Sequence, residues 1–170
     1  GLTMDYTYSA SGKILVEDKV FLPTAESGYG AETNHYLTQY TYDEQDREIQ
    51  QLSYLNDEVL GVHTNYKYDN SGNLLLVHDV DKDGQLKMKY EATYNRVGKI
   101  EKSTVISYLS FGTLTTTWEY SYDSEGYLIL EEEYQDGKPA HVLKDHKYDE
   151  AGNLLSCNSY GVDGVVYTEY

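Results

Sequence analysis

The sequence predicts an all-β protein: an antiparallel up-and-down meander of about twelve short strands, built from six hairpin repeats. Three observations support this fold class. A pattern Tyr-x-Tyr-Asp-x-x-Gly-x-Leu recurs along the chain, four of its six copies have Asp or Asn followed three residues later by Gly, and apolar and polar residues alternate between the turns. Only Pro23 and Pro139 interrupt the 170 residues, and no low-complexity linker divides them, so we expect one domain over residues 1–170.

The repeat itself gives the strand–turn–strand units in order. Its copies occupy residues 6–14, 40–48, 66–74, 92–100, 120–128 and 146–154. The pattern is typical of a type I turn that is capped by the Asp side chain and closed by a Gly in the left-handed region, with Asp46 replacing Gly in the second copy. We therefore assign a structural role to Tyr8, Gly12, Tyr42, Tyr68, Asp69, Gly72, Tyr94, Gly98, Tyr122, Asp123, Gly126, Tyr148, Asp149 and Gly152.

A second set of turns connects one repeat to the next. It is less regular and lies at residues 28–30, 56–58, 83–84, 112, 136–137 and 163–164. If the bulged turn alone sets the register, Tyr8 faces Ile14, Tyr6 faces Val16 and Tyr120 faces Leu130. The motif tyrosines then share one apolar face with the Leu or Ile after each Gly. Because no helical pattern is available to cover this face, we expect a closed or nearly closed barrel, with an open curved single sheet as the alternative.

At these residues the chain resembles the YD (RHS) repeat family, whose pattern is Tyr-x-Tyr-Asp-x-x-Gly-Arg/Asn-Leu. Residues 72–74 and 152–154 follow the end of that pattern, whereas Lys13, Arg47, Lys99 and Tyr127 stand at its Arg/Asn position. The resemblance implies a spiral β-hairpin shell, a bacterial cell-envelope or extracellular location, and carbohydrate binding. It extends to small secreted or lipoprotein-like bacterial proteins with porin-like barrels, which implies a lipid anchor on the precursor.

Aromatic residues outside the repeat are the candidates for ligand binding, since aromatic faces pack on sugar rings. They are Trp118, Tyr127, Tyr134, Tyr108 and Phe111. A tyrosine that is present in every copy more simply serves the repeat, and single exposed aromatics are common.

An acidic turn offers a candidate metal site. Asp79, Asp81 and Asp83 alternate before Gly84, as in the first half of a calcium loop, but Tyr90 stands where the bidentate Glu of an EF-hand is required. A plain acidic hairpin turn is the simpler interpretation, so no cofactor is expected, with calcium as the alternative. In the derived register His63 also faces Asp79, an acid–base or metal hypothesis that competes with a solvated ion pair.

Two further features remain ambiguous. Glu131 faces Glu119 in the derived register, and two like charges in that position indicate a bound cation, a neighbouring Lys or simply a solvated surface. Cys157 is the only cysteine, which excludes an intramolecular disulfide, and no His at a catalytic spacing accompanies it.

Composition narrows the function. The net charge of −16 argues against nucleic-acid binding, and no apolar run of about 20 residues exists that could span a membrane as a helix. No nucleophile or phosphate-binding motif is present. The sequence favours a non-enzymatic secreted or cell-surface repeat scaffold whose partner is a glycan or another envelope protein. The alternative is a carbohydrate-binding module with aromatics at a barrel mouth, and a third hypothesis is a metal or enzymatic site at the acidic turn.

Overall fold

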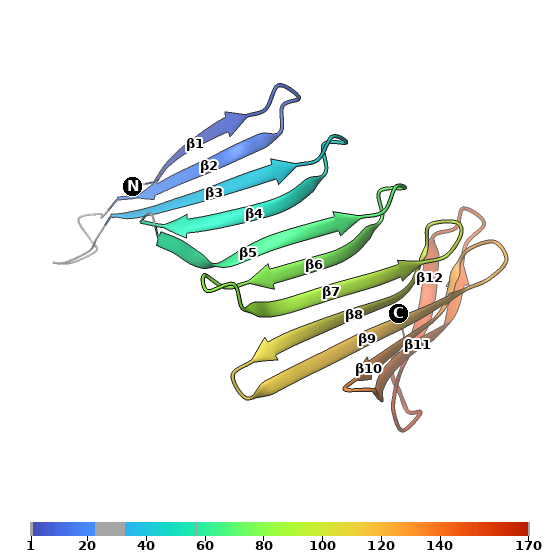
Figure 1. Cartoon of the computed structure of the whole chain (residues 1–170). Helices are drawn as coiled ribbons and strands as arrows, with labels where there is room; N and C mark the ends of the chain where they lie inside the picture. Colours follow the sequence, from blue (N-terminus) through green and yellow to red (C-terminus); the bar gives the residue numbers. More distant parts are fainter. Residues whose placement is uncertain (1, 23–32, 57, 170) are drawn as a thin grey trace. The chain divides into compact units, whose positions relative to one another are not determined.

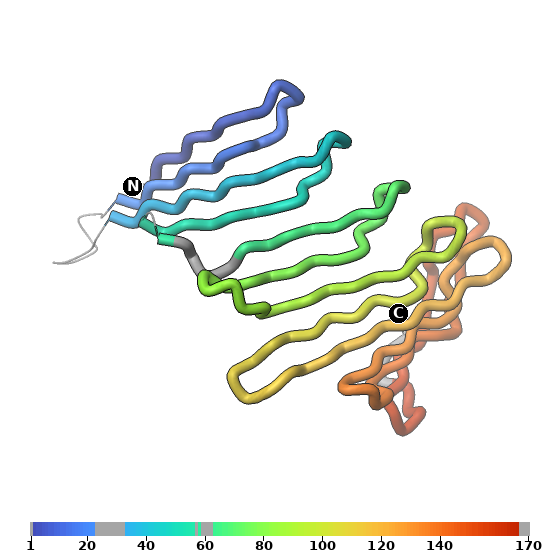
Figure 2. The backbone as a smooth tube through the Cα atoms, in the orientation of Figure 1, coloured from blue at the N-terminus to red at the C-terminus, as the bar shows by residue number. Residues whose placement is uncertain are grey.

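The computed structural model describes residues 2–22, 33–56 and 58–169, and within them it is a sheet of antiparallel strands. The strands are β1 (Leu2–Tyr8), β2 (Ile14–Phe21), β3 (Asn34–Tyr42), β4 (Glu48–Leu55), β5 (Glu58–Tyr68), β6 (Leu74–Val80), β7 (Leu86–Tyr94), β8 (Ile100–Leu109), β9 (Gly112–Tyr122), β10 (Leu128–Gln135), β11 (Lys138–Tyr148), β12 (Leu154–Gly161) and β13 (Val166–Glu169). They follow chain order across the sheet, as Figures 1 and 2 show. The all-β up-and-down prediction is confirmed.

The sheet is open. Among the described residues β1 pairs only with β2 and β13 only with β12, so hydrogen bonds do not close a barrel and the alternative of an open sheet holds. A thirteenth short strand, β13, adds to the about twelve expected from six hairpins. The turn expected at residues 28–30 lies outside the described residues.

The strands belong to two compact units, residues 1–67 with 77–87 and residues 68–76 with 88–170. Each unit is built from the same hairpin and is considered by itself below. The expectation of a single domain stays a prediction.

The predicted Asp–Gly turns are present. In the third copy the backbone N–H of Gly72 donates to the carbonyl of Asp69, and the Asp69 carboxylate accepts the N–H groups of Ser71 and Asn73. The side-chain amide of Asn73 donates to the same carboxylate, and these hydrogen bonds hold the pKa of Asp69 below its usual range. Gly72 has a φ of 91°, and Asp46, which replaces Gly in the second copy, adopts 59°.

The predicted register is correct for one pair and then wrong by one residue. Tyr8 pairs with Ile14 as expected, but a β-bulge follows at once, and Tyr6 pairs with Glu17 instead of Val16. A bulge places one extra residue on one strand, which exchanges the two faces of that strand from there on. The same irregularity follows the first pair of other repeats, at residues 41–42, 93–94 and 128–130.

The bulge of the fifth repeat changes which charges face each other. Tyr120 pairs with Glu131 instead of the expected Leu130, and Glu119 pairs with Glu132 instead of Glu131. Glu131 therefore lies on the face that carries the motif tyrosines, hereafter the tyrosine face. The opposite side of the sheet, on which Glu119 lies, is called the polar face.

The motif tyrosines connect each hairpin to the preceding one. Their hydroxyls donate to the carbonyl of the residue two positions after the preceding turn Gly, at 2.8–2.9 Å. The pairs are Tyr42 with Ile14, Tyr94 with Leu74, Tyr122 with Ile100, and Tyr148 with Leu128. Each of these carbonyls belongs to the first residue of a strand, and those of Ile14, Ile100 and Leu128 lie next to a bulge, where the regular ladder of hydrogen bonds is interrupted.

The residue after the turn Gly makes a second connection. Lys99 reaches over the next turn, where its ammonium donates to the Gly126 carbonyl and lies 5.2 Å from the centroid of the Tyr122 ring. Tyr127 repeats this arrangement one hairpin further: its ring stacks on Tyr148 with centroids 4.8 Å apart. Lys99 and Tyr127 thus join successive turns, whereas Arg47, at the same position of the pattern, bonds to Asp43 of its own turn.

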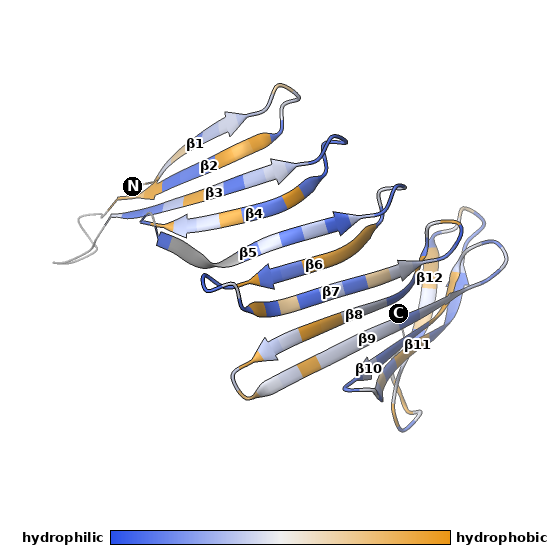
Figure 3. Cartoon of the chain, in the orientation of Figure 1, coloured by the Kyte–Doolittle hydropathy of each residue, from blue (hydrophilic) through white to orange (hydrophobic). Residues whose placement is uncertain are grey.

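The interior of the sheet contains small side chains. Among the described residues, the buried ones are Val77, Ala92, Ser103, Cys157 and Ser159. Ala92 pairs with Ser103 and is followed two residues later by Tyr94, which places this pair on the tyrosine face. The motif tyrosines beside such small residues are half-buried, except Tyr8 on the edge strand, which is 55 % exposed. Figure 3 shows the resulting interleaving of hydrophobic and hydrophilic residues along the strands.

Candidate functional site

The polar face of the second unit carries an ordered row of polar side chains across β8 and β9. Lys102 pairs with Glu119, and its ammonium lies 2.7 Å from the Glu119 carboxylate. Thr104 pairs with Thr117, and their hydroxyls are 3.2 Å apart. Because the side chains of Lys102 and Glu119 are about half exposed, this ion pair adds little stability and remains accessible from solvent.

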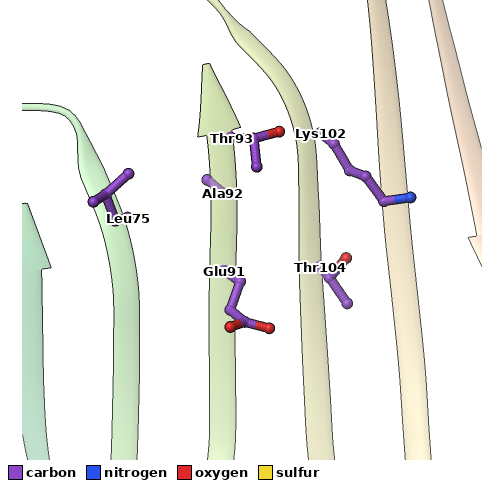
Figure 4. A pocket seen from close by; sticks show the side chains of 6 residues that line it. All are labelled: Leu75, Glu91, Ala92, Thr93, Lys102 and Thr104. Carbon is purple, nitrogen blue, oxygen red and sulfur yellow. The ribbon is translucent and has the colours of Figure 1, made fainter. Parts of the chain in front are cut away.

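A shallow depression of about 340 Å³ lies on one side of the Lys102–Glu119 pair. It is lined by Leu75, Glu91, Ala92, Thr93, Lys102 and Thr104, as Figure 4 shows. These residues come from β6, β7 and β8, so the depression crosses three strands. Its wall combines one aliphatic side chain with hydroxyl, carboxylate and ammonium groups.

A second depression of about 180 Å³ adjoins the same ion pair. Lys102, Thr117, Glu119, Tyr134 and Gly137 line it. The Tyr134 side chain is half-buried. The Glu132 carboxylate, with partial burial and Glu119, raises the pKa of Tyr134, so its hydroxyl remains a hydrogen-bond donor at neutral pH. One aromatic ring, two hydroxyl-bearing threonines and an ion pair therefore share one continuous surface.

The structure does not bring the five predicted aromatics together. Tyr134 and Tyr108 lie on the polar face, since they pair with Thr117 and Thr113, whereas Trp118 pairs with Ser103 on the tyrosine face. Phe111, at the β8–β9 turn, is 87 % exposed. Tyr127 lies at a turn and stacks on Tyr148, as described above. Only Tyr134 lines one of the two depressions.

One of the three aspartates, Asp81, makes the hydrogen bonds that stabilise the acidic turn. The Asp81 carboxylate accepts the N–H groups of Asp83 and Gln85 and lies 2.8 Å from the Lys87 ammonium. These contacts hold the pKa of Asp81 below its usual range. No group of three metal-ligating side chains occurs in the described part of the chain. One oxygen of Asp79 and the Nε2 atoms of His63 and His78 are enclosed without a hydrogen-bond partner, and the pairing of His63 with Asp79 stays a prediction.

Sequence reasoning missed the ion pair that joins the two depressions. Lys102 and Glu119 were not singled out as partners, because the bulge near the start of β8 decides which face Lys102 occupies. The signal that could have found it is the alternation of Lys102 and Thr104 on one strand with Thr117 and Glu119 on the next. The register also answers the question raised by facing glutamates, since Lys102 is the neighbouring Lys that compensates Glu119.

Comparison with known proteins shows the fold. No family model matches the chain, and no curated protein is similar to it in sequence. Among solved structures it is similar to a crystal structure of TcdB2–TccC3–Cdc42, with a TM-score of 0.53 and 13 % identity. It is also similar to TcdB2–TccC3 without the hypervariable C-terminal region, with a TM-score of 0.53 and 12 % identity. Both matches cover 99 % of this chain and 12 % of the other.

These similar structures are toxin-complex chains with RHS/YD-repeat shells, which agrees with the repeat resemblance at the level of fold. The chain thus spans about an eighth of their length. Within the described residues, no helix is long and apolar enough to cross a membrane.

Proposed function

We propose that this chain is a non-enzymatic repeat scaffold of the bacterial cell envelope or of a secreted protein, and that it presents its faces to another molecule. One observation carries the proposal: the side chains that recur in each repeat form contacts within or between hairpins. The tyrosine hydroxyls bond to the preceding hairpin and the Asp carboxylates cap turns. The residue after Gly bonds to its own turn, as Asn73 does, or to the next one, as Lys99 does. Because the repeated side chains form these structural contacts, we infer that the residues between them bind the partner molecule.

The groups with catalytic potential also support a non-enzymatic role. The Ser159 hydroxyl lies 2.5 Å from Nε2 of His141, but Ser159 is only 7 % exposed, so a substrate would have little access to it. Cys157 is buried on the same strand. Both side chains fill the interior of the sheet.

The location is tested by treating intact cells of the source bacterium with a protease and probing for this chain. We expect the chain either to disappear from the cells while a cytoplasmic marker survives, or to be found in the medium. If the chain is protected until the cells are lysed, the proposed location is wrong. Expression in the source organism keeps any targeting information of the full-length gene in place.

Carbohydrate binding is the second candidate, and the paired depressions on the polar face favour it. Tyr134 offers an aromatic face at the edge of one depression, and threonine hydroxyls with the Lys102–Glu119 pair offer hydrogen bonds to sugar hydroxyls. This arrangement is typical of sites that combine one stacking surface with a few polar groups.

We expect Tyr134→Ala to abolish binding to any glycan that the protein recognises on a glycan array, because the stacking surface is lost. Phe111→Ala is the matched control: it removes a more exposed aromatic that lies outside both depressions and should leave binding unchanged. Circular dichroism of both variants should match that of the parent protein. Equal loss in both variants, or no glycan bound by the parent protein, would remove this candidate.

A further inference from the structure

The tyrosine face carries three side chains outside the repeat, Trp118, Glu131 and Glu133, beside Tyr120, the first residue of the fifth copy. On β9, Trp118 and Tyr120 are two residues apart and therefore point to the same face. Their direct partners on β10 are Glu133 and Glu131, respectively. We call these four residues the Trp–Glu block. The two cross-strand pairs are adjacent, so the side chains form a compact patch two strands wide.

All four side chains are half-buried, so the patch is partly shielded from water. Burial raises the pKa of Glu131, and the neighbouring Glu133 carboxylate raises it further, whereas His141 and His146 act in the opposite direction. Glu131 in turn helps to raise the pKa of Tyr120 and of Tyr122. The carboxylate thus lies among aromatic rings in surroundings that disfavour its charge.

The fold provides little positive charge to compensate these carboxylates. Glu133 accepts a hydrogen bond from the neutral amide of Gln135 at 3.0 Å and pairs across β11 with His141. Two lysines near β10 are engaged elsewhere: Lys102 bonds to Glu119 on the polar face, and Lys144 lies 4.3 Å from the centroid of the Tyr160 ring. A third, Lys138, pairs with Gln135 at the end of β10. Nδ1 of His146, a residue that interacts with Glu131, is enclosed without a hydrogen-bond partner.

Aromatic rings beside carboxylates suit a particular ligand chemistry. A cation is attracted to the face of an aromatic ring, most strongly to that of Trp, and a carboxylate supplies charge-assisted hydrogen bonds to the same N–H groups. The protein already uses this chemistry internally, since the Lys99 ammonium lies over Tyr122, two residues along β9 from Tyr120. The net charge of −16 would also draw cations toward the molecule.

We propose that the Trp–Glu block binds an organic cation, either an alkylammonium or a guanidinium group. The cation lies against the rings of Trp118 and Tyr120 while its N–H groups donate to Glu131 and Glu133. This site lies on the opposite face from the depressions around Tyr134, so it is independent of the glycan candidate. Its ligand is a small amine or the Lys or Arg side chain of a peptide, two sources with the same chemistry.

Trp118 is the only tryptophan of the chain, so its fluorescence reports on this site alone. We expect n-butylammonium and ethylguanidinium to change the Trp fluorescence saturably, and the neutral 1-pentanol, of similar size, to leave it unchanged. A short peptide with a single Arg distinguishes the sources. Tighter binding of the peptide identifies a protein partner, and equal binding identifies a small amine. Binding should weaken as the pH falls through the raised pKa of Glu131 and the carboxylate is neutralised.

The acidic strand provides its own control. Glu131→Gln and Glu133→Gln should each weaken binding about tenfold or more, because each removes a charge-assisted hydrogen bond. Glu132→Gln removes the same charge from the same strand but on the polar face, and should leave affinity within about twofold of the parent. Thermal melting of the three variants verifies that they fold. The proposal is overturned if no cation changes the fluorescence, if 1-pentanol binds as well as n-butylammonium, or if Glu132→Gln weakens binding as much as the other two substitutions.

Discussion

Replacing Gly152 by alanine is expected to lower the free energy of unfolding by about 2–4 kcal/mol, in part because its φ of 82° is strained for any residue with a Cβ. A Cβ at this position would also lie 2.9 Å from the ring and hydroxyl of Tyr127. That ring cannot move away freely, since it stacks on Tyr148. Gly152 therefore has two roles: it adopts the positive φ that its own turn requires, and it leaves space for the Tyr127 side chain from the preceding turn.

Gly98→Ala is the matched control for this substitution. Gly98 has a φ of 80° and belongs to the same unit, but a Cβ there would meet only Asn73 Oδ1, at 3.9 Å. It should cost only the backbone strain of about 1–2 kcal/mol. Urea denaturation measures both, and in a Tyr127→Ala background Gly152→Ala should cost no more than Gly98→Ala does in the parent protein. Equal costs for the two glycines would show that the contact between turns contributes nothing.

The hairpins were predictable from the sequence because their determinants are local. The type I turn, its Asp cap and the left-handed Gly lie within five residues, and the pair that closes the turn, such as Tyr8 with Ile14, follows from them. Asp46 adopts a positive φ as the pattern requires, although it is not a glycine. The residues of the turn were therefore sufficient to predict the fold class and the first residue pair of each hairpin.

The register beyond the turn was not predictable from one repeat. The bulge that follows Tyr8 lies beside Ile14, the carbonyl of which accepts the hydroxyl of Tyr42 from the next hairpin. That acceptor is 28 residues from its donor, so no local pattern reveals it. The shift by one residue exchanged the two faces of each following strand, and with them the residues that form a site. This is why Lys102 and Glu119, which line the same depression as Tyr134, were missed, whereas the role of Tyr134 in binding stays a prediction.

The role of the tyrosine hydroxyls is testable in the second unit, where Tyr94, Tyr122 and Tyr148 each donate to the preceding hairpin. Changing all three to Phe is expected to lower the free energy of unfolding by about 3 kcal/mol or more, since one such hydrogen bond contributes about 1 kcal/mol and its loss leaves a carbonyl without its partner. Because one repeat separates successive tyrosines by two strand spacings, about 10 Å, the three single substitutions should add. Urea denaturation of the single, double and triple variants measures both the size and the additivity.

Tyr108→Phe removes the same hydroxyl from a tyrosine outside the pattern and should change stability by less than about 0.5 kcal/mol. A triple variant as stable as this control would mean that the hydroxyls do not connect the hairpins. The comparison of Tyr with Phe also bears on why the chain contains many Tyr and few Phe residues. Phe would fill the sheet as well as Tyr, yet the chain has 20 Tyr and 2 Phe. A carbonyl beside a bulge needs a donor that reaches it from the next hairpin, and a phenol hydroxyl supplies one while its ring stays half-buried on the sheet.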